Sequence, residues 1–167
     1  ASPLNHNLST YKKSRSLRAA LFIFRYCDQP SPPFQGFNRI FFLFVKFVSC
    51  VMSYCDFYSF KAGEKQKDSY LKAVLLCLSS YKTKIKGGID TVYFGGGTPS
   101  VFGGERIAEV IDCIRKNFSL TSDAEITVEC NPSSVDGELV CHLKAVGVNR
   151  ISMGMQSAVE RERKALG

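Results

Sequence analysis

The sequence predicts an α/β protein with a parallel β-sheet, and two observations support this fold class. From about residue 69, stretches with apolar residues at helical spacing alternate with short apolar runs that are typical of strands. Glycine or other turn residues separate most of these stretches, as expected at the ends of helices and strands. Strands and helices in alternation imply right-handed βαβ units, whose strands lie parallel in one sheet.

The first elements of this series are two helices with a strand between them. The first helix is predicted from about residue 69 and its unit ends at Gly87-Gly88, after which Ile89–Phe94 is predicted to be a strand. The apolar residues that define the two helices are Leu71, Val74, Leu75 and Leu78 in the first, and Ile107, Val110, Ile111, Ile114 and Phe118 in the second.

The later elements repeat the alternation. Glu125–Cys130 is predicted to be a strand, and Asp136 is a plausible N-cap for a third helix that ends at Gly147. Arg150–Gln156 is predicted to be the next strand, and a further helix begins near Val159. The series thus predicts one domain, or part of a larger one, in a chain of 167 residues.

Composition argues against two classes of protein. The net charge of +7 would suit a nucleic-acid partner, but residues 1–50 hold seven of the 22 basic residues and one of the 15 acidic ones. The remainder is nearly neutral, and no stretch interleaves aromatic and basic residues as RNA-binding motifs do, so we expect no nucleic-acid partner. The seven cysteines are odd in number and several fall in predicted helices, which argues against a secreted disulfide framework and for a reducing compartment.

The N-terminal part differs from the rest. The apolar stretch from Arg39 to Tyr54 is too short for a membrane span of about 20 residues and too far from the start for a signal peptide. We expect a buried strand followed by a loop, with a membrane anchor as the alternative. Residues 1–38 stay unassigned, as a disordered leader or as foreign sequence joined to the domain.

The three later strands end in residues that suit a polar ligand: Gly95-Gly96-Gly97, Glu129 and Gln156. Because the carboxyl ends of parallel strands meet at one edge, we expect these groups at one mouth. Glycine has no Cβ, so a ligand can approach the main chain, and the three N–H groups are expected to be free to bind it. The alternatives are a simple strand-ending turn at the glycines and solvated strand ends at Glu129 and Gln156.

Four motifs occur in a fixed order over about residues 53–167, and together they resemble one family. They are Ser53–Phe60 (SYCDFYSF), Gly95–Ser100 (GGGTPS), Glu129–Pro132 (ECNP) and Gly147–Ser157 (GVNRISMGMQS). They resemble the radical S-adenosylmethionine (SAM) superfamily, in the group of oxygen-independent coproporphyrinogen III oxidase and the HemW-like haem chaperones. The resemblance implies a partial (β/α) barrel with about four of six βα units, formed by residues 39–167 and truncated at the C-terminus.

The resemblance also implies cofactors and site residues. Members of the family bind SAM and a [4Fe–4S] cluster held by a C-x3-C-x2-C motif, and this group handles haem or porphyrin. Cys55 matches the last cluster ligand, and Tyr54 matches the aromatic residue near the adenine. The positions that match SAM contacts are Gly95, Gly96, Gly97, Thr98, Glu129 and Gln156.

The cluster motif departs from the family pattern. Aligned on Cys55, the other two ligand positions hold Met52 and Val48, and Cys50 does not fit the spacing. A neutral thioether is a poor substitute for a thiolate on iron. We therefore expect no stable cluster, unless Cys50 and Cys27 complete the site, and whether the chain is an enzyme stays open.

The residues after Cys55 indicate a branch of the group. Asp56-Phe57-Tyr58-Ser59 resembles the chaperone branch, because the oxidase branch carries a Gly-Cys pair there. The predicted function is a radical SAM protein acting in haem metabolism or haem delivery, in the cytoplasm or in an organelle of a eukaryote. One alternative is an inactive remnant that keeps the scaffold. A phosphate-binding α/β protein is disfavoured, because no Gly-Lys-Ser/Thr follows the glycines.

Overall fold

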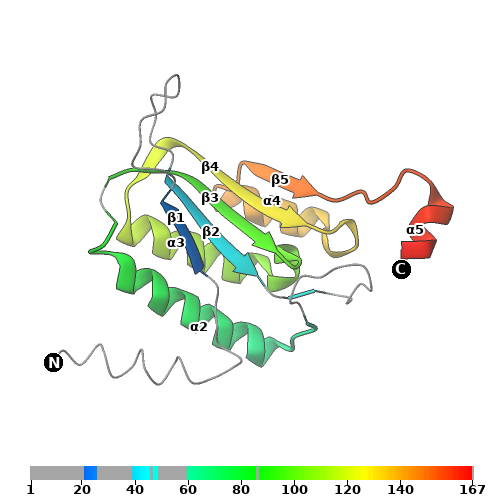
Figure 1. The fold of residues 1–167 in the computed structure, drawn as a ribbon, viewed down its shortest axis with the longest axis horizontal. Helices are drawn as coiled ribbons and strands as arrows, with labels where there is room; N and C mark the ends of the chain where they lie inside the picture. The colour runs from blue at the N-terminus through cyan, green and yellow to red at the C-terminus, as the bar shows by residue number, and fades with distance from the viewer. Residues whose placement is uncertain (1–20, 26–38, 46, 49–59, 86, 167) are drawn as a thin grey trace.

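A five-stranded sheet forms the centre of the protein in the computed structural model, which describes residues 21–25, 39–45, 47–48, 60–85 and 87–166 (Figure 1). The strand order is β1-β2-β3-β4-β5. Strands β2 to β5 are parallel, whereas β1 pairs with β2 in the antiparallel direction. The strands are β1 (Leu21–Arg25), β2 (Arg39–Val45), β3 (Ile89–Gly96), β4 (Leu120–Cys130) and β5 (Arg150–Met153). The α/β prediction is confirmed.

The helices between the parallel strands cover one face of the sheet, whereas the C-terminal helix lies away from it (Figure 1). The α-helices are α2 (Glu64–Tyr81), α3 (Gly104–Asn117), α4 (Gly137–Ala145) and α5 (Glu160–Leu166). Two short 3-10 helices, η1 (Pro99–Phe102) and η2 (Pro132–Ser134), follow β3 and β4. The Asp136 carboxylate accepts a hydrogen bond of 2.8 Å from the Leu139 N–H, so it caps α4 as predicted.

The core lies between the sheet and the helices. Alternate strand residues point into it, because side chains of a strand alternate between its two faces. The buried strand side chains on this face include Phe41, Leu43 and Val45 of β2, Val92 and Phe94 of β3, and Ile126 and Val128 of β4. They pack against buried side chains of the helices, among them Val74, Leu78, Ile107, Ile111 and Leu143.

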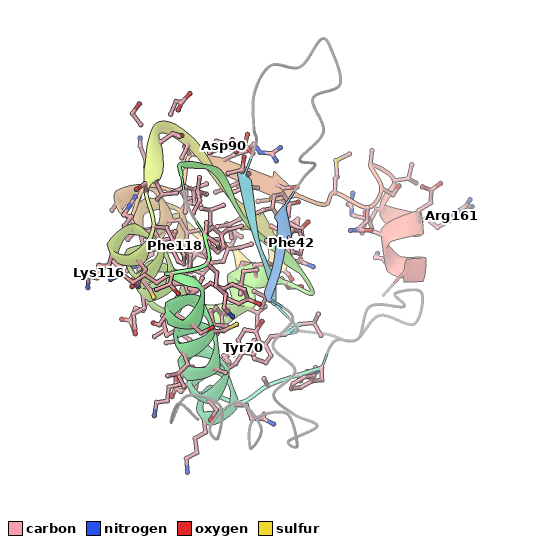
Figure 2. The ribbon with its side chains drawn as sticks, turned by 60° about the vertical axis from the view of Figure 1, so that its left-hand side comes forward. Phe42, Tyr70, Asp90, Lys116, Phe118 and Arg161 are labelled. Carbon is pink, nitrogen blue, oxygen red and sulfur yellow. The ribbon has the colours of Figure 1, made fainter. Side chains whose placement is uncertain are left out.

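An aromatic cluster closes the core below the end of β2. Phe47 lies with its ring centroid 5.1 Å from Tyr70 and 5.8 Å from Phe102, and Phe60 packs edge-on against Phe47 at 5.6 Å. Tyr70 reaches this cluster from α2 (Figure 2). Tilted and edge-to-face rings at these distances stabilise one another beyond the burial of their surface.

Four element boundaries differ from the predictions, and the first is the end of β3, which lies at Gly96 rather than at Phe94. Helix α2 begins at Glu64, β4 begins at Leu120, and β5 ends at Met153 rather than at Gln156. Strand β5 stops there because Met153 pairs with Cys130, the last residue of β4, so no neighbouring strand continues. The apolar periodicity of one segment carries no information on where its partner strand ends, so it could not predict this boundary.

The N-terminal part of the chain contains strands β1 and β2. The buried strand predicted within Arg39–Tyr54 is β2, while the loop after it, residues 49–59, lies outside the described residues. Strand β1 falls within residues 1–38, which the sequence left unassigned. In the described part of the chain, none of the helices has both the length and the apolar character that a membrane span requires.

Candidate functional site

A pocket of about 270 Å³ opens at the carboxyl ends of β3, β4 and β5. Each strand end contributes residues to it, because the three parallel strands finish at the same edge of the sheet. The lining residues are Gly97 and Thr98 after β3, Glu129, Cys130 and Asn131 at the end of β4, and Ser152, Gly154 and Gln156 in and after β5. Glu129 is the one charged side chain among these described lining residues.

The structure brings together four of the predicted site residues, namely Gly97, Thr98, Glu129 and Gln156. Gly95 and Gly96 lie directly before them in β3 and do not line the pocket. Tyr54 and Cys55 lie outside the described residues, so their predicted roles remain predictions. The sequence did not single out the other four lining residues as site residues, since only their position beside Glu129 and Gln156 in space places them in the pocket: Cys130, Asn131, Ser152 and Gly154.

The N–H groups of the glycine run are used inside the protein, so the expectation that they are free for a ligand is wrong for two of the three. The Gly96 N–H donates to Glu129 Oε2 at 3.0 Å, and the Gly97 N–H donates to Val45 O at 2.6 Å. The next amide, that of Thr98, donates to Phe47 O at 2.6 Å. These hydrogen bonds connect the end of β3 to β4 on one side. On the other side they connect it to the last residue of β2 and to the chain just after it.

Two glycines are required by this geometry. Gly96 has a φ of +112°, which side chains of L-residues rarely adopt. A Cβ on Gly97 would lie 2.6 Å from Phe47 O, so the chain after β2 could not approach. The sequence predicted that the glycines let a ligand approach the main chain, whereas the group that approaches Gly97 in the structure is main chain of the same protein.

Glu129 is held in place from two directions. The Tyr93 hydroxyl donates to its Oε1 at 2.6 Å, and the Gly96 N–H donates to its Oε2. Burial, and then the hydrogen bond to Glu129, raise the pKa of Tyr93, so this phenol stays protonated and donates at neutral pH. Each carboxylate oxygen has a second lone pair left for a ligand.

Hydroxyl groups of η1 and η2 connect the segments that follow β3 and β4, next to the pocket. Ser100 Oγ lies 2.6 Å from Ser134 Oγ and accepts a 3.3 Å hydrogen bond from the Asn131 N–H. Asn131 Oδ1 accepts from the Ser133 N–H at 2.9 Å, which turns the chain after β4. These bonds fix the ends of β3 and β4 relative to each other, and so fix Thr98 relative to Glu129.

Gln156 occupies an unusual backbone conformation at the rim. Its φ is +65°, and it is the one non-glycine residue with positive φ in the described ranges. Such a conformation costs of the order of 1 kcal/mol for an L-residue and concentrates at functional sites. A Cβ on Gly154 would lie 2.7 Å from Gln156 Nε2, so Gly154 leaves room for this side chain.

Among the residues that the structure describes, no donor set fits an iron–sulfur cluster. The described residues contain no group of three or more Cys, His, Asp or Glu placed to hold a metal ion. Cys77, Cys113, Cys130 and Cys141 are free and lie on four different elements, while Cys27, Cys50 and Cys55 fall outside the described part. Val48, at an expected ligand position, offers only a hydrocarbon side chain. The carboxylate, hydroxyl and amide groups of the pocket do fit the polar groups of SAM.

Curated relatives resemble the chain over most of its length. It is 39% identical to the heme chaperone HemW of Mycobacterium tuberculosis over 124 residues, which cover 72% of the chain and 32% of the relative. It is 37% identical to HemW of Escherichia coli over 129 residues, covering 75% and 34%. It is 32% identical over 142 residues to the mitochondrial radical S-adenosyl methionine domain-containing protein 1 of Bos taurus, covering 83% and 32%. The chain thus spans about a third of the length of these relatives.

The solved structure of coproporphyrinogen III oxidase (HemN) from Escherichia coli, described as a radical SAM enzyme, has the same fold. It superposes with a TM-score of 0.70 and 25% identity, over 76% of this chain and 30% of HemN. The partial-barrel prediction is therefore confirmed. Residues 53–167 match the radical SAM superfamily, and the chain belongs to that superfamily.

Proposed function

We propose that this chain binds SAM in the pocket at the ends of β3, β4 and β5, within a protein that binds and delivers haem. One observation carries the SAM assignment: a carboxylate, Glu129, fixed by two hydrogen bonds at the mouth of a polar pocket. SAM presents an ammonium group and ribose hydroxyls, all of them donors that a fixed carboxylate accepts. Thr98 and Gln156 add a hydroxyl and an amide beside it.

The haem part of the proposal rests on relatives and on one motif. Two relatives with the name HemW are 37% and 39% identical to this chain. The run Asp56–Ser59 after Cys55 resembles the chaperone branch of the group. Because the chain covers about a third of these relatives, haem delivery is proposed for the whole protein, in the cytoplasm or in mitochondria, rather than for this part alone.

Titration of the chain with SAM tests the binding proposal. We expect weak binding, with a Kd of about 0.1 mM, which corresponds to about −5.5 kcal/mol. Chemical shifts of the Gly97, Thr98 and Gln156 amides, followed by NMR, should move with SAM concentration and saturate. Adenosine and methionine added separately should bind more weakly than SAM. If the shifts do not move at several millimolar SAM, the proposal is wrong.

The absence of cysteine at positions 48 and 52 of the cluster motif leads to a second prediction. The chain as it stands should take up no stoichiometric iron or sulfide after anaerobic reconstitution. The double variant Val48→Cys with Met52→Cys completes the C-x3-C-x2-C spacing with Cys55, and should take up about four iron and four sulfide ions per chain. Iron and sulfide analysis, with absorbance near roughly 400 nm, measures the gain.

Two controls make this result specific. Val48→Ser with Met52→Ser changes the same positions without adding thiolates, and should bind no cluster. Adding Cys55→Ser to the double cysteine variant should abolish the gain. A stoichiometric cluster in the unchanged chain would contradict the prediction and would show that other cysteines supply the ligands.

A further inference from the structure

Tyr93 lies on the face of the sheet opposite to the helices, and it pairs with Thr127, two residues before the pocket residue Glu129. Its neighbours across the sheet are Phe42 on β2 and Thr127 on β4. The rings of Tyr93 and Phe42 stack with centroids 5.2 Å apart and planes inclined by 10° (Phe42 is labelled in Figure 2). This stacking restricts rotation of the phenol, because a half-buried ring on the neighbouring strand lies against its face.

The absence of a side chain at Gly95 leaves space for the Tyr93 ring to reach Glu129. Residues two apart on a strand share a face, so a side chain at position 95 would stand between Tyr93 and Glu129. A Cβ there would lie 2.6 Å from Tyr93 Cε1 and 3.1 Å from Phe42 Cζ. The bare backbone at Gly95 thus allows the hydroxyl to cross to β4 and reach Glu129 Oε1 at 2.6 Å.

We propose that Tyr93 is a positioning residue for the ligand of this pocket: its hydroxyl orients the Glu129 carboxylate, and Gly95 lacks a side chain so that it can do so. The proposal rests on the proposed SAM site, and names a residue that acts on it through Glu129. With Oε1 bound to Tyr93 and Oε2 bound to Gly96, the carboxylate cannot rotate without breaking a hydrogen bond. The ligand then meets a preformed acceptor and spends no free energy on ordering it.

The charges around Tyr93 favour this role. Burial and Glu129 raise the pKa of Tyr93, whereas the positive charge of Arg150 and a hydrogen bond with Ser152 act in the opposite direction. Arg150 is itself engaged with Glu125 at 3.0 Å and with Thr127 Oγ1 at 2.9 Å. The phenol therefore keeps its proton and donates a hydrogen bond to Glu129. A phenolate would instead place a second negative charge beside the carboxylate.

The first test is SAM affinity in the full chain with Tyr93→Phe, which removes the hydroxyl and keeps the ring. We expect the Kd for SAM to rise about fivefold to tenfold, the effect of one hydrogen bond to a charged group. Gly95→Ala should weaken binding at least as much, because its Cβ displaces the Tyr93 ring. Tyr81→Phe, a matched change at the end of α2, should leave the affinity unchanged. Equal affinity in the Tyr93→Phe variant and the parent chain overturns the proposal.

A second test reports on the contact itself and does not depend on SAM. In protein labelled with 13C at tyrosine Cζ, the Tyr93 signal is assigned by its loss in Tyr93→Phe and then titrated. Its pKa should lie above the ordinary tyrosine value in the parent chain, and should fall toward that value in Glu129→Gln. An unchanged Tyr93 pKa in that variant overturns the positioning role. A parent chain that shows this shift but does not bind SAM refutes the proposed function, while the orientation of Glu129 by Tyr93 stands.

Discussion

Replacing Glu129 with alanine should raise the Kd for SAM at least about thirtyfold, so that saturation is not reached at practical concentrations. The substitution removes the one charged side chain among the described residues of the pocket. It also leaves the Tyr93 hydroxyl and the Gly96 N–H without their acceptor. Both consequences weaken binding, because the donor groups of SAM lose their acceptor and the two freed donors of the protein then face them.

NMR titration with SAM measures this effect, and Glu125→Ala is the matched control. Glu125 lies on the same strand and the same face, but it pairs with Arg150 away from the pocket. Its removal should change the Kd less than about twofold, because an exposed ion pair contributes little. Equal losses in the two variants would show that the pocket responds to the charge of the sheet face and not to Glu129 itself.

Replacing Phe102 with alanine should lower the free energy of unfolding by about 3–5 kcal/mol. Phe102 is fully buried in η1, and its ring centroid lies 5.8 Å from Phe47 and 5.7 Å from Tyr70. Truncation leaves a cavity beneath the segment that carries Thr98 into the pocket. Because small domains have a total stability of about 5–15 kcal/mol, this one change would remove much of it.

Urea unfolding followed by circular dichroism measures the loss, with Leu76→Ala as the control. Leu76 projects from α2 and is 59% exposed, so its truncation removes an apolar side chain without opening a cavity. We expect the control to stay within about 0.5 kcal/mol of the parent chain. A Phe102→Ala variant within 1 kcal/mol of the parent would mean that the aromatic cluster repacks around the missing ring.

Local signals in the sequence were sufficient for most elements of the fold. Asp136 and Gly147 mark the two ends of α4, because capping and the left-handed conformation depend on residues close in sequence. Strand β1 could not be found in this way, since its five residues depend on antiparallel pairing with β2. The end of β5 likewise depends on where β4 stops.

In the candidate site too, some features could be predicted from the sequence, and those that depend on contacts between distant residues could not. Gly97, Thr98, Glu129 and Gln156 meet because parallel strands end at one edge, and that rule can be applied to a sequence. The partners of Gly96 and Gly97 could not be predicted, because Glu129 and Val45 are distant in sequence and the sheet register brings them close. Tyr93 was missed for the same reason, since its partner lies 36 residues further along. The one local signal was Gly95, two residues after Tyr93 on the same face.

The hydrogen bonds from Gly97 to Val45 and from Thr98 to Phe47 have a consequence for the segment that begins at the end of β2. They attach the first residues of that segment to the same backbone that borders the pocket. Motion of the pocket rim and motion of the point where the segment departs are thereby correlated. Local opening of the chain at Phe47 would therefore also loosen the backbone at Thr98, so the stability of the end of β2 and the shape of the pocket rim are coupled.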